Sequence, residues 1–302
     1  MNRLLILAFI TAVVFGLSVF LRVDAGGLAL LDSTAHDFLI REIRLPRALL
    51  AAIIGASLAS CGLLFQSTLR NPLASEFTLG ASAGASLGVM LAVLMGLGTG
   101  FLMLGGFAFA GAAAISLPAY LLALRRRVPP EAVLLAGVAL SFAAMAVTSG
   151  ANFVASSGSM MTFVRWSLGD IAVLGFDKIG MAGLPCLLPV ATAWAMRHRL
   201  DAMSGGEELA LARGVEVSRL RGITVLVVTV AVGASVAVCG PIGFIGLVVP
   251  HMARGLVGYS HGRLTIATPL LGAGLVLVCD LIGRNLVRGM EIPLGTTAAA
   301  IG

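Results

Sequence analysis

The sequence predicts an all-α membrane protein that crosses the lipid bilayer many times. Of its 302 residues, 59% are hydrophobic and 11% are charged, and the mean hydropathy is +1.04. Long apolar runs follow one another along the whole chain. A bilayer core of about 30 Å takes roughly 20 helical residues to cross, and backbone groups inside lipid must be satisfied internally. This composition excludes an ordinary soluble domain.

Nine complete membrane spans are expected from these runs. They cover residues 4–21, 48–67, 77–95, 101–124, 132–154, 179–196, 222–239, 241–257 and 265–282. A tenth run begins at Pro293 and stops at Gly302, about half the length of a crossing. We therefore expect one transmembrane domain over residues 1–302 whose last helix is truncated. The first run is longer than the core of a signal peptide, so we expect it to be a retained helix.

Basic residues predict that the N-terminus is cytoplasmic. Arginine and lysine are enriched in cytoplasmic loops, and this orientation places the arginines at 125–127 and those of the loop 197–221 on the inner side. The whole net charge of +6 then falls on that side. The same rule does not explain Arg41, Arg44 and Arg47, which it places on the outer side.

Small residues at helical spacing predict closely packed helices. Gly80, Gly84 and Gly88 repeat every four residues, and Gly55 lies in a similar ridge of small residues in the second span. Such ridges let helix backbones approach each other inside a membrane. We expect tight packing within the subunit or against a second copy, rather than a role in lining a substrate path.

Neither a metal site nor a catalytic centre is expected. The cysteines lie in or at the ends of apolar spans without a CxxC pair, and the histidines show no HxxxH or HExxH spacing. These residues are Cys61, Cys186, Cys239, Cys279, His36, His198, His251 and His261. Buried thiols act as small hydrophobic groups, and scattered histidines offer no nucleophile with its base. We expect no catalytic residue, no metal ligand and no cofactor on this chain.

The absence of a phosphate-binding loop limits the energy source. No GxxxxGK[ST] segment occurs, so the chain itself is not expected to bind ATP. Ion-coupled carriers place ionisable residues in mid-span, and the centres of these spans are almost free of them. Transport driven by a separate ATPase is therefore favoured, and a secondary transporter that works without an ATPase is the alternative.

The longest inner loop contains a predicted short helix. Gly206 precedes Glu207 and Glu208, which suit the first turn of a helix, and Gly214 suits its end after Arg213. Two interpretations of this loop stay open on composition alone. It is either a solvated loop that carries the positive inner charge or a contact for a soluble partner.

Six segments, in this order, resemble the permease family of ABC importers for iron–siderophore complexes, haem and cobalamin. They are RLPRALLAAIIGASLASCGLLFQSTLRNPLASEFTLGASAGASLGV, LLAGVAL, RWSLGD, GEELALARGVEV, GPIGFIGLVVPHMARGLVG and EIPLGTTAAAIG. The resemblance covers residues 41 to 302. It implies a type II importer permease fold with ten transmembrane helices and both ends in the cytoplasm.

The resemblance also implies partners and a location. Members of this family work as dimers of permeases, so a second copy or a close homologue is expected. Two ABC ATPase subunits would bind ATP and Mg²⁺, and a periplasmic or lipid-anchored binding protein would deliver the cargo. The expected location is the cytoplasmic membrane of a bacterium or archaeon, in contact with lipid and without nucleic acid. The sequence does not distinguish an iron–siderophore complex from haem or cobalamin.

On the outer side, the resemblance assigns binding-protein docking to Arg44, Arg47 and Arg284. Arginine recognises carboxylates with a fixed, two-pronged geometry, and arginines that reach to lipid head groups are the alternative. Asp280 lies near the outer end of the ninth span. An unpaired acid in lipid is costly, so we expect Asp280 to pair with Arg284 one turn further on.

On the inner side, the resemblance implies a gate and a coupling helix. The gate candidates are Asn71, Pro72 and Leu73, in a turn that is otherwise explained as a helix breaker. The predicted short helix resembles the coupling helices that fit a cleft on each ATPase. Its candidate residues are Gly206, Glu207, Glu208, Arg213 and Gly214.

Overall fold

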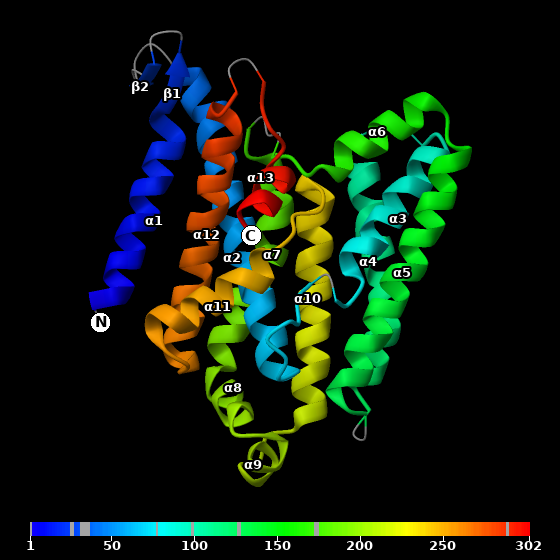
Figure 1. Ribbon diagram of the computed structural model, residues 1–302, viewed down its shortest axis with the longest axis vertical. Coiled ribbons are helices and arrows are strands. Elements are labelled where there is room, and N and C mark those ends of the chain that lie inside the picture. Colours follow the sequence, from blue (N-terminus) through cyan, green and yellow to red (C-terminus); the bar gives the residue numbers. More distant parts are fainter. Residues whose placement is uncertain are drawn as a thin grey trace.

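The computed structural model describes residues 2–24, 27–30, 37–76, 78–97, 100–125, 128–171, 175–287 and 290–302. Helices make up most of this part of the chain (Figure 1). The helices are α1 (Asn2–Phe20), the π-helix η1 (Leu39–Arg44), α2 (Leu45–Thr68), α3 (Ala81–Leu94), α4 (Phe101–Ala123), α5 (Pro130–Val154), α6 (Ser157–Ser167), α7 (Asp177–Ala195), α8 (Arg197–Ser204), α9 (Glu207–Ala212), α10 (Val217–Cys239), α11 (Ile245–Val257), α12 (His261–Asn285) and α13 (Leu294–Ile301). An antiparallel hairpin of β1 (Leu21–Asp24) and β2 (Gly27–Leu30) follows α1.

The prediction of a helical, multi-span membrane protein is confirmed, but the count of ten crossings stays a prediction. Within the described residues, seven helices are long and apolar enough to cross a membrane. The expected spans 77–95 and 241–257 correspond to α3 and α11, which have only 14 and 13 residues. At 1.5 Å per residue each is about 20 Å long. Both helices start late because Gly80 and Phe244, just before them, adopt left-handed conformations.

The helix α2 lies in the centre of the bundle. It packs against α7, α10, α11 and α12, and most of its residues are buried. A Cβ atom added to Gly55 would overlap the carbonyl oxygen of Gly272, and one added to Gly62 would overlap that of Gly246. Glycine therefore lets α2 meet α12 and α11 backbone to backbone, as small residues do in membrane helices.

The glycine ridge of α3 packs in the same way against α4. A Cβ on Gly84 would overlap the carbonyl oxygen of Gly111, and a Cβ on Gly111 would overlap that of Gly84. Gly88 lies equally close to the carbonyl oxygen of Phe107. The predicted tight packing at this ridge is confirmed, and it occurs within the subunit.

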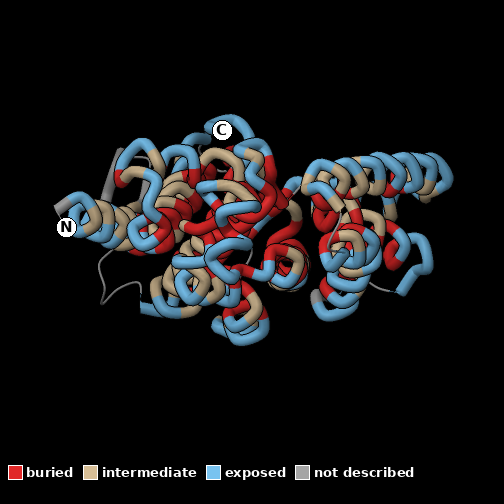
Figure 2. Tube along the Cα trace, turned by 90° about the horizontal axis from the view of Figure 1, so that it is seen from below, coloured by how far each residue is buried: buried red, intermediate tan, exposed pale blue. Residues whose placement is uncertain are grey.

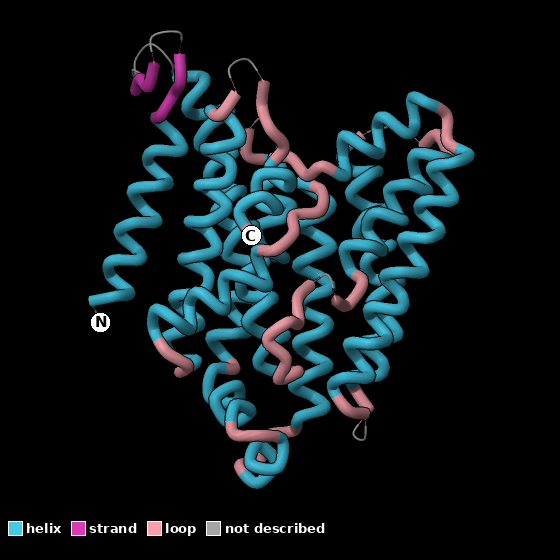
Figure 3. Tube along the Cα trace, in the orientation of Figure 1, coloured by secondary structure: helices cyan, strands magenta, loops and turns pink. Residues whose placement is uncertain are grey.

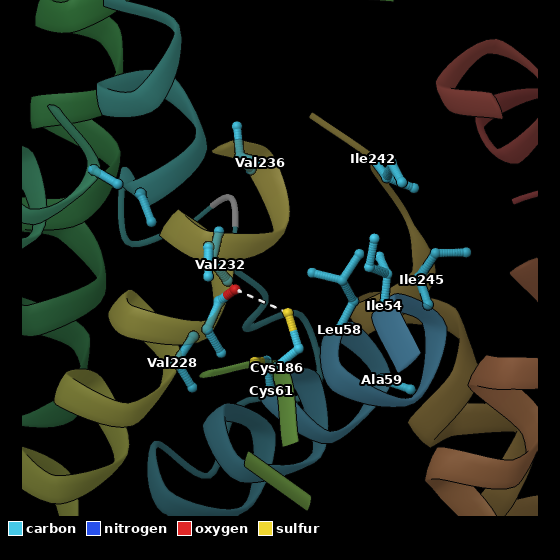
Figure 4. Packing of buried hydrophobic residues seen from close by; sticks show 14 of the residues in the cluster. Ile54, Leu58, Ala59, Cys61, Cys186, Val228, Val232, Val236, Ile242 and Ile245 are labelled. Atoms are coloured by element: carbon cyan, nitrogen blue, oxygen red, sulfur yellow. Dashed lines mark hydrogen bonds between the residues drawn. The ribbon is translucent and has the colours of Figure 1, made fainter. Parts of the chain in front are cut away.

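Apolar side chains fill the space between α2, α7 and α10. Figure 4 shows Leu58 of α2 and Val232 of α10 in this cluster, with Cys186 of α7 between the two helices. The Cys186 thiol lies 4.0 Å from the carbonyl oxygen of Ala231. All four cysteines are buried and unpaired by disulfides, which confirms their predicted role as small apolar groups. Seen from below, buried residues gather where the helices meet (Figure 2).

The two ends of the bundle carry different elements (Figures 1 and 3). The hairpin and α6 lie at one end, which we call the hairpin end, and α8 and α9 lie at the other, the α9 end. The helix α6 was not expected from the sequence. Its N-cap is Ser156, whose Oγ accepts a hydrogen bond from the Ser159 N–H at 3.3 Å. The cytoplasmic N-terminus stays a prediction, and two arginines used for it, Arg126 and Arg127, lie outside the described residues.

Replacement of Gly84 by alanine is expected to destabilise the protein. The added Cβ would overlap backbone atoms of α4, and overpacking of this kind costs about 1–3 kcal/mol. The matched control is Gly150→Ala in α5, where a Cβ has no neighbour within 4 Å. Thermal unfolding in detergent should show a lower midpoint for Gly84→Ala alone. Equal midpoints for the two variants would contradict the backbone contact between α3 and α4.

Candidate transport sites at the two ends of the bundle

Arg47 of α2 is the centre of an ion-pair cluster at the hairpin end. Its Nε lies 2.8 Å from Asp280 Oδ1, its Nη1 lies 2.8 Å from Glu291 Oε2, and its Nη2 lies 3.7 Å from Asp170 Oδ1. Asp280 Oδ2 also lies 2.9 Å from the Nε of Arg284. The Asp280 side chain is fully buried, and both arginine side chains are 10% exposed. The cluster ties α2 and α12 to the two connections that carry Asp170 and Glu291.

The predicted pair of Asp280 and Arg284 is confirmed. The guanidinium of Arg284 also donates to the Ser18 carbonyl oxygen at 2.9 Å and to Ser18 Oγ at 2.8 Å. Arg44 donates to the Leu21 carbonyl oxygen at 2.6 Å. The three arginines expected to dock a binding protein therefore lie at one end and all have contacts within the chain. Their docking role stays a prediction.

Glu76 is a buried acid that the sequence did not point to. It lies in the connection between α2 and α3 and is 1% exposed. Its carboxyl group packs against Gly246, near the start of α11, and neither oxygen has a hydrogen-bond partner among the described groups. Burial raises the pKa of the Glu76 carboxyl to about 7, although nearby backbone N–H groups of Glu76 and Gly246 favour the charged form. Nothing local in the sequence shows that this connection folds into the protein.

The gate candidates form the turn that ends α2. The helix stops at Thr68, and Arg70 adopts a left-handed conformation with φ of 49°. The side-chain oxygen of Asn71 then accepts a hydrogen bond from the Leu73 N–H at 2.9 Å. The Leu73 side chain is 70% exposed, and Pro72 is exposed as well. The expected helix break is confirmed, and the gating role stays a prediction.

The short helix predicted in the longest inner loop is confirmed as α9. Arg213 is its C-cap, and Gly214 follows in a left-handed conformation with φ of 77°. The Gly214 N–H donates to the Leu211 carbonyl at 2.9 Å, and the Val215 N–H donates to the Ala210 carbonyl at 2.9 Å. This pair of bonds is a Schellman motif, which requires the left-handed residue that glycine provides.

The surface of α9 mixes apolar and charged side chains. Leu209 is 41% exposed and Leu211 is 59% exposed, and Glu208 and Arg213 are exposed beside them. Glu207 points back to the bundle and forms an ion pair with Arg221 of α10. The helix protrudes at its end of the molecule (Figure 1). It therefore offers a fixed amphipathic surface that the rest of the subunit does not cover.

Polar side chains connect α8 with the inner parts of α2 and α12. The Nδ1 of His261 lies 2.8 Å from Asp201 Oδ1, and its Nε2 lies 2.8 Å from Ser67 Oγ. Next to Ser67 on α2, the Oε1 of Gln66 accepts a hydrogen bond from Arg254 of α11 at 2.7 Å. These residues come from four helices and share no motif, so no local pattern predicts that they meet.

Substitution of Asp280 is expected to be strongly destabilising. Asp280→Asn would leave two buried arginines without their shared carboxylate, and loss of one member of a buried ion pair costs about 3–5 kcal/mol. The control is Asp37→Asn, which removes an exposed pair with Arg41 at 2.6 Å and should cost less than about 1 kcal/mol. Denaturant-induced unfolding in micelles measures both free energies. Similar small values would show that the Arg47 cluster adds little to stability.

The raised pKa of Glu76 predicts a pH-dependent stability. Below pH 4.5 the acid is protonated in both states and has no effect. The ordinary pKa of 4.5 applies to the unfolded chain, and the pKa in the folded protein is about 7. Between these two values the unfolded chain loses its proton before the folded protein does, so the free energy of unfolding falls as pH rises. The total fall is about 3 kcal/mol. Glu76→Gln should lack this component when unfolding is followed from pH 5 to 8. Identical pH profiles would contradict a neutral, buried Glu76.

Comparisons with known proteins identify the family. Residues 4–302 match the FecCD transport family. The chain is 34% identical over 270 residues to the Fe(3+)-citrate import system permease protein YfmE of Bacillus subtilis (strain 168), with 89% of this chain and 80% of that protein covered. It is 35% identical over 311 residues to the vitamin B12 import system permease protein BtuC of Serratia proteamaculans (strain 568), with 100% and 90% covered.

Solved structures agree with the sequence comparisons. A structure described as an inward-facing conformation of a metal-chelate type ABC transporter superposes with a TM-score of 0.88 at 27% identity, with 100% of this chain and 95% of that chain covered. A structure of PsaBC from Streptococcus pneumoniae shares the fold, with a TM-score of 0.59 at 19% identity and coverage of 89% and 92%. The chain belongs to the FecCD transport family, whose relatives named here are permease proteins of import systems.

Proposed function

We propose that this chain forms the translocation pathway of an ATP-driven importer for an iron chelate, with haem or cobalamin as the other cargoes of the family. Its membership in the FecCD transport family carries the proposal, because relatives matched over 80% and 90% of their length are named as permeases for Fe(3+)-citrate and vitamin B12. In this role the chain binds no ATP. A separate ATPase binds ATP and Mg²⁺, and the permease performs no covalent chemistry. The family match does not favour an ion-coupled carrier.

The proposed assembly follows the family pattern. Ten crossings, with α3 and α11 among them and α13 as the start of the tenth, would place the N-terminus and α9 in the cytoplasm and the hairpin end outside. Two permease chains, identical or closely related, would enclose the pathway in the cytoplasmic membrane of a bacterium or archaeon. Two ATPase subunits would lie at the α9 end, and a periplasmic or lipid-anchored binding protein would lie at the hairpin end. The net positive charge of the predicted inner loops supports this orientation.

The proposed contact with the ATPase is α9. Leu209 and Leu211 can enter an apolar cleft while Glu208 and Arg213 bind its rim. The Schellman motif at Gly214 and the ion pair of Glu207 hold the helix in place, so movement of an ATPase would move α8 and α9 together. The bonds from Asp201 through His261 to Ser67 would then carry this movement to the end of α2.

The proposed gate lies directly after that end of α2. Asn71, Pro72 and Leu73 form a turn in which the Ala74 N–H donates to the Asn71 carbonyl at 3.1 Å and the Leu73 N–H donates to Asn71 Oδ1. A turn of this kind can move when α2 and α8 shift, because few packed side chains restrain it. The exposed Leu73 side chain would close the inner exit in one conformation and leave it in the other.

The proposed docking site for the binding protein is the Arg47 cluster with Arg44 and Arg284. Asp170 and Glu291 compensate the arginine charge, and their side chains are 45% and 57% exposed. A carboxylate from the binding protein could take the place of either acid on Arg47 without leaving a buried charge unpaired. Docking would then change the contacts of α2 at one end while the ATPase acts at the other.

Loss of the apolar contact on α9 is expected to stop uptake without unfolding the permease. The double variant Leu209→Ser with Leu211→Ser removes two exposed side chains, so the fold should persist while the ATPase contact weakens. In cells that lack their own copy, uptake of radioactive ferric citrate should fall at least tenfold, which corresponds to about 1.4 kcal/mol of lost contact. His198→Ser, an exposed change on α8, should keep uptake. Normal uptake in the double variant would contradict the role of α9.

A further inference from the structure

A polar hollow lies between α4, α6, α7 and α10 at the hairpin end. Its volume is about 240 Å³, and its charged and aromatic lining consists of Arg165, Trp166, Asp170 and Lys178. The apolar part of the wall includes Leu104 of α4 and the last turn of α10. Two cations and one anion therefore face one small volume. Asp170 also lies 3.7 Å from Arg47, so its charge is shared and the hollow remains positive overall.

An apolar groove of about 260 Å³ adjoins this hollow between α4, α7 and α10. The two spaces share Ala237 and Val238. From Lys178 the groove wall continues along α7 to Met181, one turn deeper in the bundle, and along α4 from Leu102 towards Phe109. On α7 and α10 the apolar groove lies further from the hairpin end than the cationic hollow, and on α4 the two spaces begin at the same level, with Leu102 in the groove and Leu104 in the hollow. Their order is that of a lipid head group and an acyl chain.

The groove opens to the outside of the subunit and not to its core. Leu102 is 68% exposed, Met181 is 50% exposed and Phe109 is 39% exposed. Gly105 and Gly106 line the groove without side chains, which leaves space in it, and a Cβ on Gly106 would meet nothing within 4 Å. Exposed apolar walls of a membrane helix face hydrocarbon. The available occupant at this place is therefore a membrane lipid.

We propose that the hollow and groove bind one phospholipid with an anionic head group. Arg165 and Lys178 hold its phosphate, since basic side chains at a membrane surface attract anionic lipids. Trp166 lies at the level of the head group, where tryptophan is favoured. One acyl chain fills the groove over Gly106. The lipid would brace α4 against α10, two helices that pack directly on each other. The site requires only that the chain spans a membrane, so it is independent of the cargo.

Native mass spectrometry of the detergent-extracted, full-length chain tests this site. Phosphatidylglycerol or phosphatidylcholine is added to delipidated protein, and the number of lipid molecules that stay bound is compared between the two lipids. One phosphatidylglycerol should stay bound at detergent concentrations that remove phosphatidylcholine. Arg165→Ala with Lys178→Ala should lower its retention about tenfold, and Gly106→Leu should lower it by filling the groove. The matched controls are Arg41→Ala and Gly180→Leu, where an added Cβ also meets nothing within 4 Å, and both should retain the lipid.

Three results would overturn the proposal. Equal retention by the charge variant and its control would show that Arg165 and Lys178 do not bind the head group. Equal retention by Gly106→Leu and Gly180→Leu would show that the groove holds no acyl chain. Binding of free glycerol phosphate as tightly as phosphatidylglycerol would make this an anion site and not a lipid site. A monodisperse elution profile of each variant shows that the comparison concerns folded protein.

Discussion

The close backbone contacts of α2 are the constraint on which the rest of the structure depends. Gly55 of α2 meets Gly272 of α12, and Gly62 of α2 meets Gly246 of α11, without intervening side chains. Because these helices are fixed to each other, Arg47 can meet Asp280 at one end of α2, and Ser67 can meet His261 at the other. The apolar middle of the helix then needs no charge of its own. The polar contacts of Arg47 and of Ser67 lie at its two ends.

The polar groups lie at the two ends of the bundle, and there such an apolar chain can contact other proteins. The sequence has no phosphate-binding loop, and the proposed function assigns no chemistry to the bonded set of Ser67, His261 and Asp201. Each end instead offers a surface: compensated arginines at one and an amphipathic helix at the other. The central helix joins the two. Each surface could receive one of the separate proteins that the proposed importer would need.

Features that depend on local sequence could be predicted, and those that depend on distant contacts could not. Apolar runs gave the main spans, and glycine with acidic residues gave α9 with its end at Gly214. The pair of Asp280 and Arg284 followed from a four-residue spacing. In contrast, the burial of Glu76 and the link from Asp201 to His261 depend on how the chain folds back on itself. The helix α6 was missed because its polar, serine-rich sequence resembles a loop.

The most direct measurement is a mild-detergent purification of the tagged chain from its native membrane, with every bound protein identified by mass spectrometry. We expect recovery of an ATPase that carries a Walker motif, in a constant ratio to the permease. This ATPase should be lost when the α9 surface is altered. Recovery of the permease alone, still able to move a solute under an ion gradient in proteoliposomes, would contradict the account and establish a secondary transporter.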